Sequence, residues 1–513
     1  MLIKAYGSAV EGIHASIITV EVNVARGRFG YHLVGLADNA VRESRQRIIT
    51  AFQNNDLSFP RSEITINLAP ADTQKTGSAY DLTIAMGILA AAGDLKEDLI
   101  GEYLIMGELS LDGMLRPIKG ALPIAIEARK REFKGLLLPA ANASEAAIVS
   151  DIDVIPISHL MEAVQFMDRK KHIEPLTRDT RAIFFDAQQE VDQDFADVKG
   201  QENVKRALEV AAAGGHNAIM IGPPGSGKTM LAKRMSGILP PLTLNESLET
   251  TKIHSVVGKL SEDTSLVAHR PFRSPHHTIS DVALVGGGGI PQPGEISLAH
   301  NGILFLDELP EFKRQVLEVL RQPLEERKVT VSRARVTVDY PASFVLIASM
   351  NPCPCGYYNH PEKDCVCAPA QIQRYLAKIS GPLLDRIDLH VEVTPVPFEE
   401  LASKSAGESS SNIRERVIAA RQRQLHRFEG QPGIYSNAMM PSQMVRRICA
   451  IDKESESLLE IAMTKLDLSA RAFDRILKVA RTISDLSDSD SIKSEHIAEA
   501  IQYRSLDREG WGG

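Results

Sequence analysis

The sequence predicts an α/β protein that contains several domains. Its 513 residues exceed what one ordinary hydrophobic core supports, so two or three domains are expected. Between residues 194 and 396, short apolar runs alternate with helical patterns, which is typical of a mostly parallel sheet covered on both faces. The glycine-rich segment GPPGSGKT lies between the first of these runs and a helical pattern, and it favours the same fold class.

Composition narrows the class of protein. A hydrophobic fraction of 43% and a charged fraction of 24% are ordinary for a soluble globular chain, and no apolar stretch reaches the roughly 18 to 20 residues that a membrane span needs. The first residues lack the pattern of a secretion signal, so we expect a cytoplasmic protein whose thiols stay reduced. The net charge of −8 argues against a polycation that coats nucleic acid, although a local basic groove is compatible with it.

Residues 1–167 predict an α+β or α/β domain. Strand-like patterns cover 16–24, 63–70 and 135–139, and helical patterns cover 39–53, 80–93 and 120–131. The segment 168–193 is charged and weakly periodic, which indicates a linker between compact domains.

The segment 194–396 predicts the parallel-sheet domain itself, and a helical domain follows it. Its apolar strand patterns lie at 217–221, 302–308, 344–350 and 389–393. A serine-rich connection at 397–411 comes next. Residues 412–513 show only helical patterns, at 413–428, 453–466, 469–486 and 494–504, so we expect a small helical domain at the C-terminus.

The strongest chemical signal is the match of GPPGSGKT to the phosphate-binding pattern GxxxxGK[ST]. An apolar strand precedes it and a helix follows it, which is the context that such a loop requires. Glycines let backbone N–H groups close around phosphate oxygens, Lys228 neutralises phosphate charge, and Thr229 offers a hydroxyl to Mg²⁺. An ordinary glycine-rich turn is the alternative interpretation. The predicted ATP-binding residues are Gly222, Pro223, Pro224, Gly225, Ser226, Gly227, Lys228 and Thr229.

Carboxylates and an amide follow the next apolar strands. Asp307 and Glu308 end the run GILFLDEL, where one carboxylate can hold the Mg²⁺ with its water shell and the other can activate the attacking water. Asn351 ends the strand FVLIASMN, and its amide can orient the same water. Asp-Glu after a strand is unremarkable alone, but downstream of a phosphate-binding loop it predicts an ATPase.

These features resemble AAA+ ATPases, and the segments GEISLAHNGILFLDEL, ASMNPCPCG, GPLLDRIDLHVEV and LSARAFDRILKVARTISDL resemble the ComM/YifB family of magnesium-chelatase-like proteins. The resemblance covers essentially the whole chain. It implies that Asn351 is the sensor-1 residue, that Arg386 is an arginine finger reaching a neighbouring subunit, and that Arg471 is the sensor-2 residue, with a helical lid at 412–513. A finger that acts in trans implies a ring, expected to be a homo-hexamer. A local ion pair with Asp385 or Asp388 is the alternative role of Arg386.

The N-terminal domain resembles the Lon-protease-like fold that this family carries. In the segment KTGSAYDLTIAMG, however, Ala79 stands at the position of the Lon nucleophile, with Ser78 beside it. The partner lysine of Lon falls near Leu122, with Lys119 close by. A Ser/Lys protease is therefore not the favoured interpretation.

Four of the five cysteines gather between residues 353 and 367. Cys353, Cys355, Cys365 and Cys367 form the pattern C-x-C-x9-C-x-C. Two matched pairs around a turn suit a tetrahedral zinc site with four thiolates, although zinc sites more often space each pair by two to four residues. A loop of reduced thiols is the alternative, and His360 is a spare ligand. In either case we expect a structural clip beside the ATPase site rather than a redox centre.

Local features suggest DNA as the ligand on which the ATPase acts. Arg333 and Arg335 lie at the tip of a predicted hairpin, 286–289 is a run of glycines, and 413–428 is a basic helix. Each feature also suits a solvated surface, and an aromatic fraction of 5% gives no evident platform for stacking bases. The family resemblance implies an ATP-dependent helicase that drives branch migration of single-stranded or branched DNA during the integration of transforming DNA. A motor that remodels a protein partner, as the chelatase ATPase subunit does, is the alternative.

Overall fold

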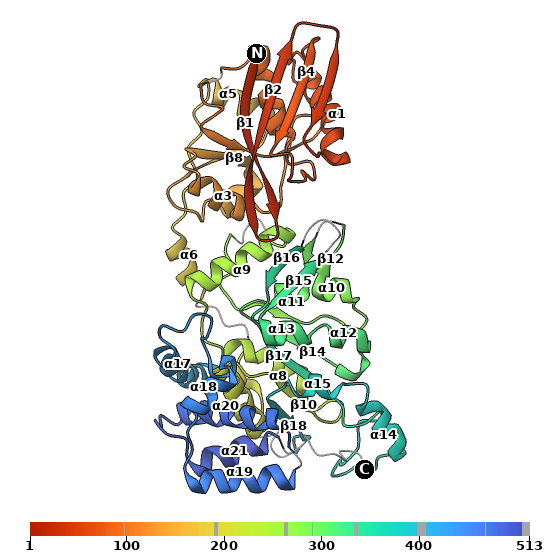
Figure 1. The fold of residues 1–513 in the computed structure, drawn as a ribbon, viewed down its shortest axis with the longest axis vertical. Coiled ribbons are helices and arrows are strands. Elements are labelled where there is room, and N and C mark those ends of the chain that lie inside the picture. Colours follow the sequence, from red (N-terminus) through yellow and green to blue (C-terminus); the bar gives the residue numbers. More distant parts are fainter. Residues whose placement is uncertain are drawn as a thin grey trace. The chain divides into compact units, whose positions relative to one another are not determined.

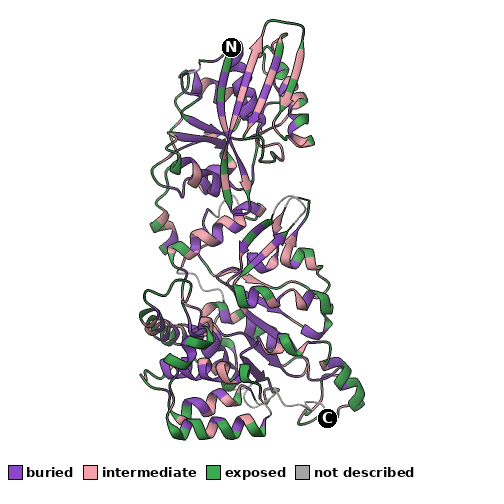
Figure 2. Ribbon diagram, in the orientation of Figure 1, coloured by how far each residue is buried: buried purple, intermediate pink, exposed green. Residues whose placement is uncertain are grey.

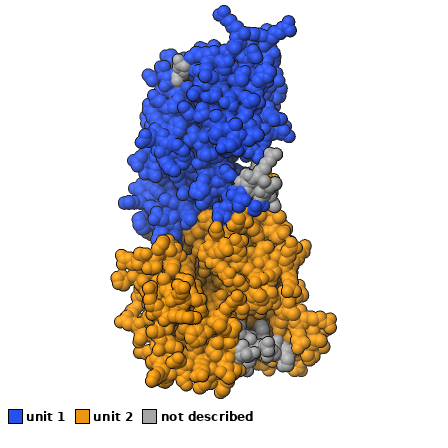
Figure 3. Space-filling view, viewed as in Figure 1, with its two compact units in different colours: residues 1–187, 243–268, 332–340 blue, residues 188–242, 269–331, 341–513 orange. Residues whose placement is uncertain are grey.

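The computed structural model describes residues 1–96, 98–188, 193–260, 265–289, 291–332, 337–397, 407–466 and 468–504. The chain divides into two compact units (Figure 3). Unit 1 comprises residues 1–187, 243–268 and 332–340, and unit 2 comprises residues 188–242, 269–331 and 341–513. None of the helices in the described residues is both long and apolar enough to cross a membrane.

Unit 1 contains a seven-stranded mixed sheet in the order β3-β4-β2-β1-β5-β8-β9 (Figure 1). The pairs β1–β2 and β2–β4 are antiparallel, and the pairs on either side of them are parallel. The strands of the sheet are β1 (Leu2–Glu11), β2 (His14–Ala25), β3 (Gly30–Val34), β4 (Glu63–Ala69), β5 (Tyr103–Ile105), β8 (Gly135–Pro139) and β9 (Asp153–Ile157). A separate two-stranded sheet pairs β6 (Glu108–Leu109) with β7 (Leu115–Arg116).

The hydrophobic core of unit 1 lies between this sheet and its helices. In β2, alternate residues Ile18, Val20 and Val22 are completely buried, which is the period of two that one buried sheet face requires. Helix α2 is apolar on all sides and almost fully buried, so it forms the centre of the core. The helices of unit 1 are α1 (Asn39–Asn54), α2 (Asp81–Ala92), α3 (Ala121–Lys130), α4 (Ala140–Ala146), α5 (Leu160–Met167), α6 (Thr180–Ala187) and α9 (Leu244–Val257).

Two findings differ from the predicted domain organisation. Helix α6 lies inside the predicted linker 168–193. Helix α9 lies inside the predicted domain 194–396 but packs on α3 of unit 1, where Gly120 N donates to Ser255 O at 3.1 Å. Charge and weak periodicity hid α6, and no local pattern could show which unit α9 joins.

Unit 2 contains a five-stranded sheet in the order β11-β14-β17-β10-β18, and every neighbouring pair is parallel. Its strands are β10 (Ala218–Ile221), β11 (Phe272–Arg273), β14 (Ile303–Leu306), β17 (Val345–Met350) and β18 (Leu389–Glu392). The four strands predicted in this region are confirmed. Strand β11 was missed because two residues in a polar segment give no periodic signal.

Helices cover this sheet, and the predicted α/β class with a C-terminal helical region is confirmed (Figures 1 and 2). Strands β10 and β14 are buried along their whole length, as expected for a parallel sheet between helical layers. One hydrophobic cluster joins Met220 of the sheet, Val210 of α7 (Glu202–Gly214), Val417 of α17 (Ser410–Arg427) and Ile476 of α20 (Ala470–Leu486). The C-terminal helices therefore share the core of the sheet.

The remaining elements of unit 2 are short helices, hairpins and the rest of the C-terminal bundle. The helices near the sheet are α8 (Lys228–Arg234), α10 (Asp281–Val285), α11 (Glu295–Leu298), α12 (Arg314–Glu318), α13 (Arg321–Glu326), α14 (Pro369–Leu376) and α15 (Gly381–Leu384). The bundle adds α18 (Ser442–Ile448), α19 (Lys453–Lys465) and α21 (Ser494–Gln502). Single 3₁₀ turns are η1 (Phe195–Asp197), η2 (Met235–Gly237), η3 (Leu309–Glu311) and η4 (Asn437–Met439).

Two antiparallel hairpins complete the fold. One pairs β12 (Gly286–Gly287) with β13 (Gln292–Pro293), in the predicted glycine-rich segment. The other pairs β15 (Lys328–Ser332) with β16 (Thr337–Pro341), so the predicted hairpin is confirmed. Its proposed DNA-binding tip, with Arg333 and Arg335, lies outside the described residues.

Candidate functional site

The predicted phosphate-binding loop, residues 222–229, joins β10 to α8 at the carboxyl end of the strand. Gly225 and Gly227 have φ angles of +79° and +88°, a region that side chains with a Cβ atom avoid. Ser226 Oγ donates to Pro223 O at 2.9 Å and closes the turn. Because the neighbouring strands are parallel, their carboxyl ends bring the following residues to the same edge of the sheet.

Lys228 lies in this turn, and only 9% of the residue's surface is exposed. Its Nζ donates to Gly222 O and to Pro223 O, each at 2.8 Å, and to Asn351 Oδ1 at 3.3 Å. Burial lowers the pKa of Lys228, and the nearby charges of Asp307 and Glu308 oppose this shift. The amine is thus held by neutral oxygens inside the turn, where an anion gains more from a positive charge than it does in bulk water.

Asp307 is held between two hydroxyl groups. Thr229 Oγ1 donates to its Oδ2 at 2.7 Å, and Ser349 donates to its Oδ1. Leu306 of β14 pairs with Ala348 of β17, so the register of the sheet places the next residues side by side. A carboxylate beside a threonine hydroxyl is a set of oxygen ligands that suits Mg²⁺.

Glu308 follows in a left-handed backbone conformation, with φ of +54° and ψ of +49°. Such a conformation costs a residue other than glycine about 1 to 3 kcal/mol, and it recurs at functional sites. His277 Nδ1 lies 3.4 Å from Glu308 Oε2, and the rings of His276 and His277 lie 4.1 Å apart. His277 therefore restrains the carboxylate that the sequence predicts as the base.

A cavity of about 470 Å³ opens beside these groups. Glu308 and Asn351 line it, together with the cationic side chains Arg374 and Lys378 from α14 and the turn after it. Lys378 Nζ lies 3.3 Å from Glu311 Oε1. The cavity thus presents two cations, the two carboxylates Glu308 and Glu311 and an amide around one space, a set of polar groups that suits a polar ligand and a reacting water.

The two arginines predicted from the family lie outside this cluster. Arg386 is buried, with its guanidinium 2.5 Å from Glu325 Oε1 and donating to Pro382 O at 2.6 Å. Arg471 is exposed, and its Nη1 lies 3.5 Å from Asp385 Oδ2. The expected alternative for Arg386, a pair with Asp385 or Asp388, is therefore replaced by a pair with Glu325.

Buried charges connect the sheet to the C-terminal helices beside Arg386. Asp388 accepts from Asn217 N at 3.1 Å and lies 3.3 Å from His216 Nδ1, and it forms an ion pair with Arg475 of α20. Burial alone would raise the pKa of Asp388, but Arg475 and His216 lower it well below its usual range. Asp388 is thus a structural anchor, and its carboxylate is fully engaged.

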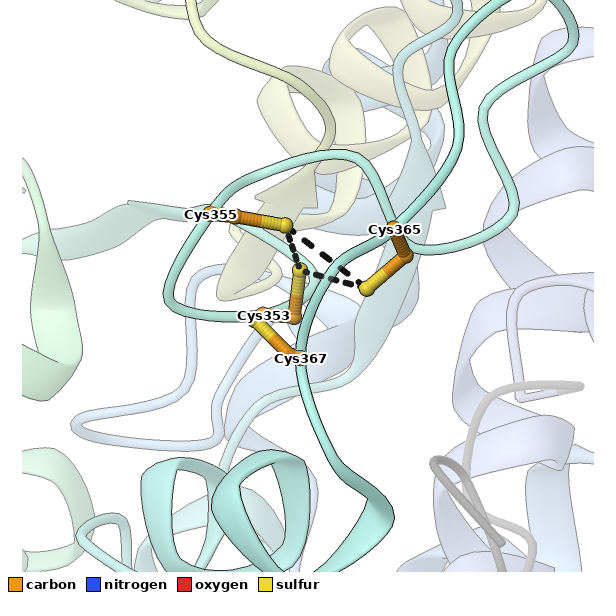
Figure 4. Close-up of side chains that lie close together, drawn as sticks. All are labelled: Cys353, Cys355, Cys365 and Cys367. Atoms are coloured by element: carbon orange, nitrogen blue, oxygen red, sulfur yellow. Dashed lines mark hydrogen bonds between the residues drawn. The ribbon is translucent and has the colours of Figure 1, made fainter.

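The four cysteines predicted as a cluster do come together (Figure 4). Cys353 Sγ lies 3.3 Å from Cys355 Sγ and 3.7 Å from Cys365 Sγ, and the latter two sulfurs are 3.6 Å apart. The four sulfurs, including that of Cys367, all lie within 4.8 Å of one another. A zinc ion with Zn–S bonds of about 2.3 Å holds its sulfurs about 3.8 Å apart in a tetrahedron.

The donor set therefore fits Zn²⁺, which prefers four thiolates in this arrangement. Gly356 N donates to Cys353 Sγ at 3.2 Å, a bond that stabilises negative charge on the sulfur. His360, the expected spare ligand, instead accepts with its Nδ1 from Glu362 N at 3.0 Å. The four cysteines alone provide the ligands of the candidate centre.

The cysteine loop touches the phosphate-binding loop. Gly356, whose φ angle is +85°, lies so close to Pro224 that a Cβ atom on Gly356 would stand 2.5 Å from Pro224 Cδ. Pro354 of the same loop lines the cavity beside Glu308 and Asn351. The predicted clip thus packs directly against the candidate nucleotide site.

The basic helix predicted as a DNA-binding element is α17, and four of its five arginines form hydrogen bonds or ion pairs within the protein. Arg416 pairs with Glu209 at 2.6 Å and with Glu408 at 2.5 Å, and Arg427 donates to Asp485 at 2.8 Å. Arg423 also pairs with two aspartates of the turn after α20. The structure therefore assigns these charges to packing of the C-terminal bundle.

The proteolytic alternative finds little support in unit 1. The Ser78 hydroxyl donates to the Glu108 carboxylate. A Lon-type nucleophile instead needs a lysine base beside the serine. Lys119, the nearest lysine to the expected position in the sequence, is exposed, and its side chain lies 3.4 Å from the Cβ position of Gly258. Ala79 offers no nucleophile.

Sequence reasoning missed two residues of the candidate site. Ser349 lies near the end of β17, two residues before Asn351, which directly follows the strand, and the alternation of a strand is a signal that side chains two residues apart share one face. His277 lies in the polar segment RPFRSPHHTISD, which gives no periodic signal. Its contact with Glu308 depends on the position of β11 in the sheet, which no local pattern indicates.

Comparisons with known protein families cover most of the chain. Residues 20–142 match the family described as subunit ChlI of Mg-chelatase. Residues 194–401 match magnesium chelatase, subunit ChlI, and residues 407–504 match its C-terminal region.

Individual relatives match over nearly the full length. The chain is 45% identical over 507 residues to the uncharacterized protein YifB of Escherichia coli, covering 98% of this chain and 96% of that protein. It is 42% identical over 510 residues to the competence protein ComM of Haemophilus influenzae, and the match covers 98% of this chain and 97% of ComM. A shorter match, 32% identical over 184 residues, relates the chain to Lon protease 2 of Bacillus subtilis and covers 33% of this chain and 32% of that protein. Together with the P-loop sheet and its site, these matches show that the chain belongs to the magnesium-chelatase ChlI-like family of AAA+ ATPases, with YifB and ComM among its homologues.

Proposed function

We propose that this chain is a ring-forming, ATP-driven DNA helicase or translocase that promotes branch migration during homologous recombination. The observation that carries the ATPase part is the convergence of Lys228, Thr229, Asp307, Glu308 and Asn351 at one edge of a parallel sheet.

The proposed roles follow from these contacts. Lys228 binds the β- and γ-phosphates of ATP together with the backbone N–H groups of residues 222–229. Thr229 and Asp307 hold the Mg²⁺ that accompanies the nucleotide. Glu308 accepts a proton from the attacking water, Asn351 orients that water, and His277 holds Glu308 in position. Bound Mg²⁺ would neutralise charge on the phosphates.

We propose that Arg386 acts on nucleotide bound to a neighbouring subunit, which requires a ring such as a hexamer. Its guanidinium is held by Glu325, whose side chain is 58% exposed. A subunit contact that draws Glu325 away would release Arg386 without unfolding the sheet. Arg471, which is exposed beside Asp385, is proposed as the second cationic group near the nucleotide.

DNA as the ligand is supported by similarity to the competence protein ComM across 98% of this chain. The name of that relative connects it with competence, in which DNA taken up by a cell is integrated by recombination. The match of three ranges to the ChlI subunit of magnesium chelatase favours a second candidate, a motor that remodels a protein partner.

Steady-state ATP hydrolysis separates these two functions. The purified full-length protein is assayed with no DNA, with single-stranded DNA and with branched DNA, and Glu308→Gln gives the background rate. We expect both kinds of DNA to raise the rate several-fold. If the protein hydrolyses ATP at a rate that does not change at any DNA concentration, the helicase function is contradicted and the protein-remodelling motor is favoured.

Mixing two inactive variants tests the ring. Arg386→Ala supplies an intact phosphate-binding loop, and Lys228→Ala supplies an intact arginine. Each variant alone should lose hydrolysis, by about 10³-fold for the arginine. We expect the mixture to regain part of the rate, because mixed interfaces unite the two functional halves. Failure to regain activity at any mixing ratio, in subunits that co-assemble, would contradict action in trans.

A further inference from the structure

A second candidate surface lies in unit 1, where the loop before β3 meets α1. Strand β3 is the edge strand of the seven-stranded sheet and pairs with β4 only. Phe29, directly before β3, is 52% exposed, although phenylalanine side chains are usually buried. We name this surface, defined by Arg28, Phe29, Tyr31, Arg45, Phe59 and Arg61, the aromatic corner.

The ring of Phe29 is held in place rather than loose. The Arg45 guanidinium lies 5.4 Å from the ring centroid of Phe29 and 5.4 Å from that of Tyr31. The rings of Phe29 and Phe59 meet edge to face at 6.5 Å, and Phe59 packs at 6.0 Å on Phe52, which is completely buried. A chain of ring contacts thus connects an exposed phenylalanine to the core, and it fixes the ring without covering it.

Positive charge surrounds this ring. Arg28 precedes Phe29 in the chain, and Arg61 is brought close because Gly30 N donates to Ser62 O at 3.5 Å. Arg42 lies one helical turn before Arg45 on α1. Arg26, Arg28, Arg42 and Arg61 are exposed, and none of them forms an ion pair with the described part of the chain.

The carboxylates near the corner do not cancel this charge. Between residues 26 and 63 the acidic side chains are Asp38, Glu43, Asp56 and Glu63, against six arginines, namely Arg26, Arg28, Arg42, Arg45, Arg47 and Arg61, of which Arg47 pairs with Asp81. Glu63 lies between His32 and the loop of the corner: its Oε1 is 3.9 Å from His32 Nε2, and its Oε2 is 3.4 Å from the Cβ position of Gly27, so it offsets one of the positive charges. The exposed arginines are therefore available to a ligand that carries several negative charges.

We propose that the aromatic corner binds single-stranded nucleic acid. Arginines that follow a phosphate backbone, beside a rigid exposed ring on which a base stacks, are the combination that such ligands need. Aspartate and glutamate side chains would use the arginines but carry no aromatic ring to stack on Phe29. This inference deepens the proposed function, on which the choice of DNA as ligand rests. The aromatic corner also provides a platform on which a base can stack. The low overall aromatic fraction did not indicate such a platform, because a few aromatic residues are sufficient when they lie together.

Direct binding tests the corner without ATP hydrolysis. The fluorescence anisotropy of a labelled oligothymidylate is measured with the full-length protein, without nucleotide, at several salt concentrations. Phe29→Ala should weaken binding about tenfold, and Phe29→Tyr, which keeps the ring, should bind like the unchanged protein. Arg129→Ala, an exposed arginine at the end of α3, is the control that should change nothing.

An oligonucleotide of the same length without bases separates stacking from charge. Phe29→Ala should bind this abasic strand as the unchanged protein does. The double variant Arg28→Ala and Arg61→Ala should weaken both strands and reduce the dependence of log affinity on log salt by about 0.7 per lost phosphate contact. Thermal unfolding of each variant checks that the exposed substitutions leave the fold intact.

The outcomes distinguish this inference from the proposed function. If Phe29→Ala and the double arginine variant bind both strands as the unchanged protein does, the aromatic corner is not the binding site. The proposed helicase function is then unaffected. If the unchanged protein binds neither strand, both the binding role of the aromatic corner and the DNA-dependent function are contradicted. If Phe29→Ala weakens binding of a polyglutamate peptide as much as that of the oligothymidylate, the ligand is an acidic protein segment and the nucleic-acid assignment is overturned.

Discussion

Two segments of this chain each combine a lysine, a threonine, a serine and a glycine turn before a helix, in different orders, and they differ in what those groups do. In unit 1 the segment KTGSAYDLT carries Lys75, Ser78 and Asp81 at the start of α2. In unit 2 the segment GPPGSGKT carries Lys228 and Thr229 at the start of α8. Both are turns with glycine in the left-handed region, followed by a helix that enters a core.

In unit 1 every one of these groups is engaged within the unit. Lys75 is completely buried and donates to Pro70 O, and Ser78 donates to Glu108. Asp81 accepts from Arg47 Nε at 2.6 Å; burial raises the pKa of Asp81, and Arg47 opposes this. The turn is held by its own bonds, and no group is left to bind a ligand.

In unit 2 the corresponding groups lie beside residues that line an open space. Lys228 is held by neutral oxygens, Asp307 by hydroxyls, and Glu308 and Asn351 face a cavity of about 470 Å³. The comparison teaches that residue types alone do not make a site. A site needs charged groups whose strongest partners are missing from the fold and that converge on space large enough for a ligand.

The largest expected effect comes from exchanging the two lysines for methionine. Lys228→Met should weaken binding of a fluorescent ATP analogue by at least about 100-fold, because the phosphates lose their buried cation. Lys75→Met should leave this affinity unchanged and alter the unfolding free energy by about 1 kcal/mol, the value of its one hydrogen bond. Titration of the analogue and urea unfolding measure the two quantities. Equal loss of ATP affinity in both variants would erase the distinction between the segments.

The carboxylates give the second test. Glu308→Gln should lower the rate of ATP hydrolysis about 10²- to 10⁴-fold while the protein still binds ATP, because the amide cannot accept the proton of the attacking water. Glu108→Gln keeps a hydrogen bond from Ser78 and should leave the rate unchanged. Single-turnover hydrolysis with bound ATP measures the effect. A Glu308→Gln protein with a normal rate would remove Glu308 from the proposed mechanism.

Metal removal tests the support of the site in unit 2. We expect one Zn²⁺ per chain by elemental analysis, released by a thiol-modifying reagent. Its loss should weaken binding of the ATP analogue by about 5- to 100-fold, because the cysteine loop that it closes packs on Pro224. Cys353→Ser should behave like the metal-free protein. A metal-free protein with unchanged affinity would make the loop a passive neighbour of the nucleotide site.

The smallest effect is expected from one added methyl group in that loop. Gly356→Ala should lower ATP affinity about three- to tenfold, because its Cβ would stand 2.5 Å from Pro224 Cδ. Gly430→Ala is the matched control: its φ angle of +77° imposes a similar backbone cost, but nothing lies within 4 Å of its Cβ position. If both variants lose the same affinity, backbone strain rather than the contact explains the loss.

The sequence predicted the local parts of unit 2 well. The strands β10, β14, β17 and β18, the phosphate-binding loop and the carboxylates Asp307 and Glu308 each follow from a continuous pattern of residues. The cysteine cluster follows from spacing within fifteen residues. Local patterns suffice here because apolar strands, glycine turns and short loops are determined by neighbours along the chain.

Which of these parts meet depends on contacts between distant segments of the chain. The tertiary structure brought His277 to Glu308 through strand β11, paired Arg386 with Glu325, and moved α9 into unit 1. It also gathered Phe29, Tyr31 and Phe59 around Arg45, although they are spread over thirty-one positions. The physical reason is that contacts between distant segments depend on the packing of whole elements and on the order of strands in a sheet. A local pattern shows which secondary structure a segment favours. The tertiary structure determines which polar and charged groups are paired within the protein and which can bind a ligand.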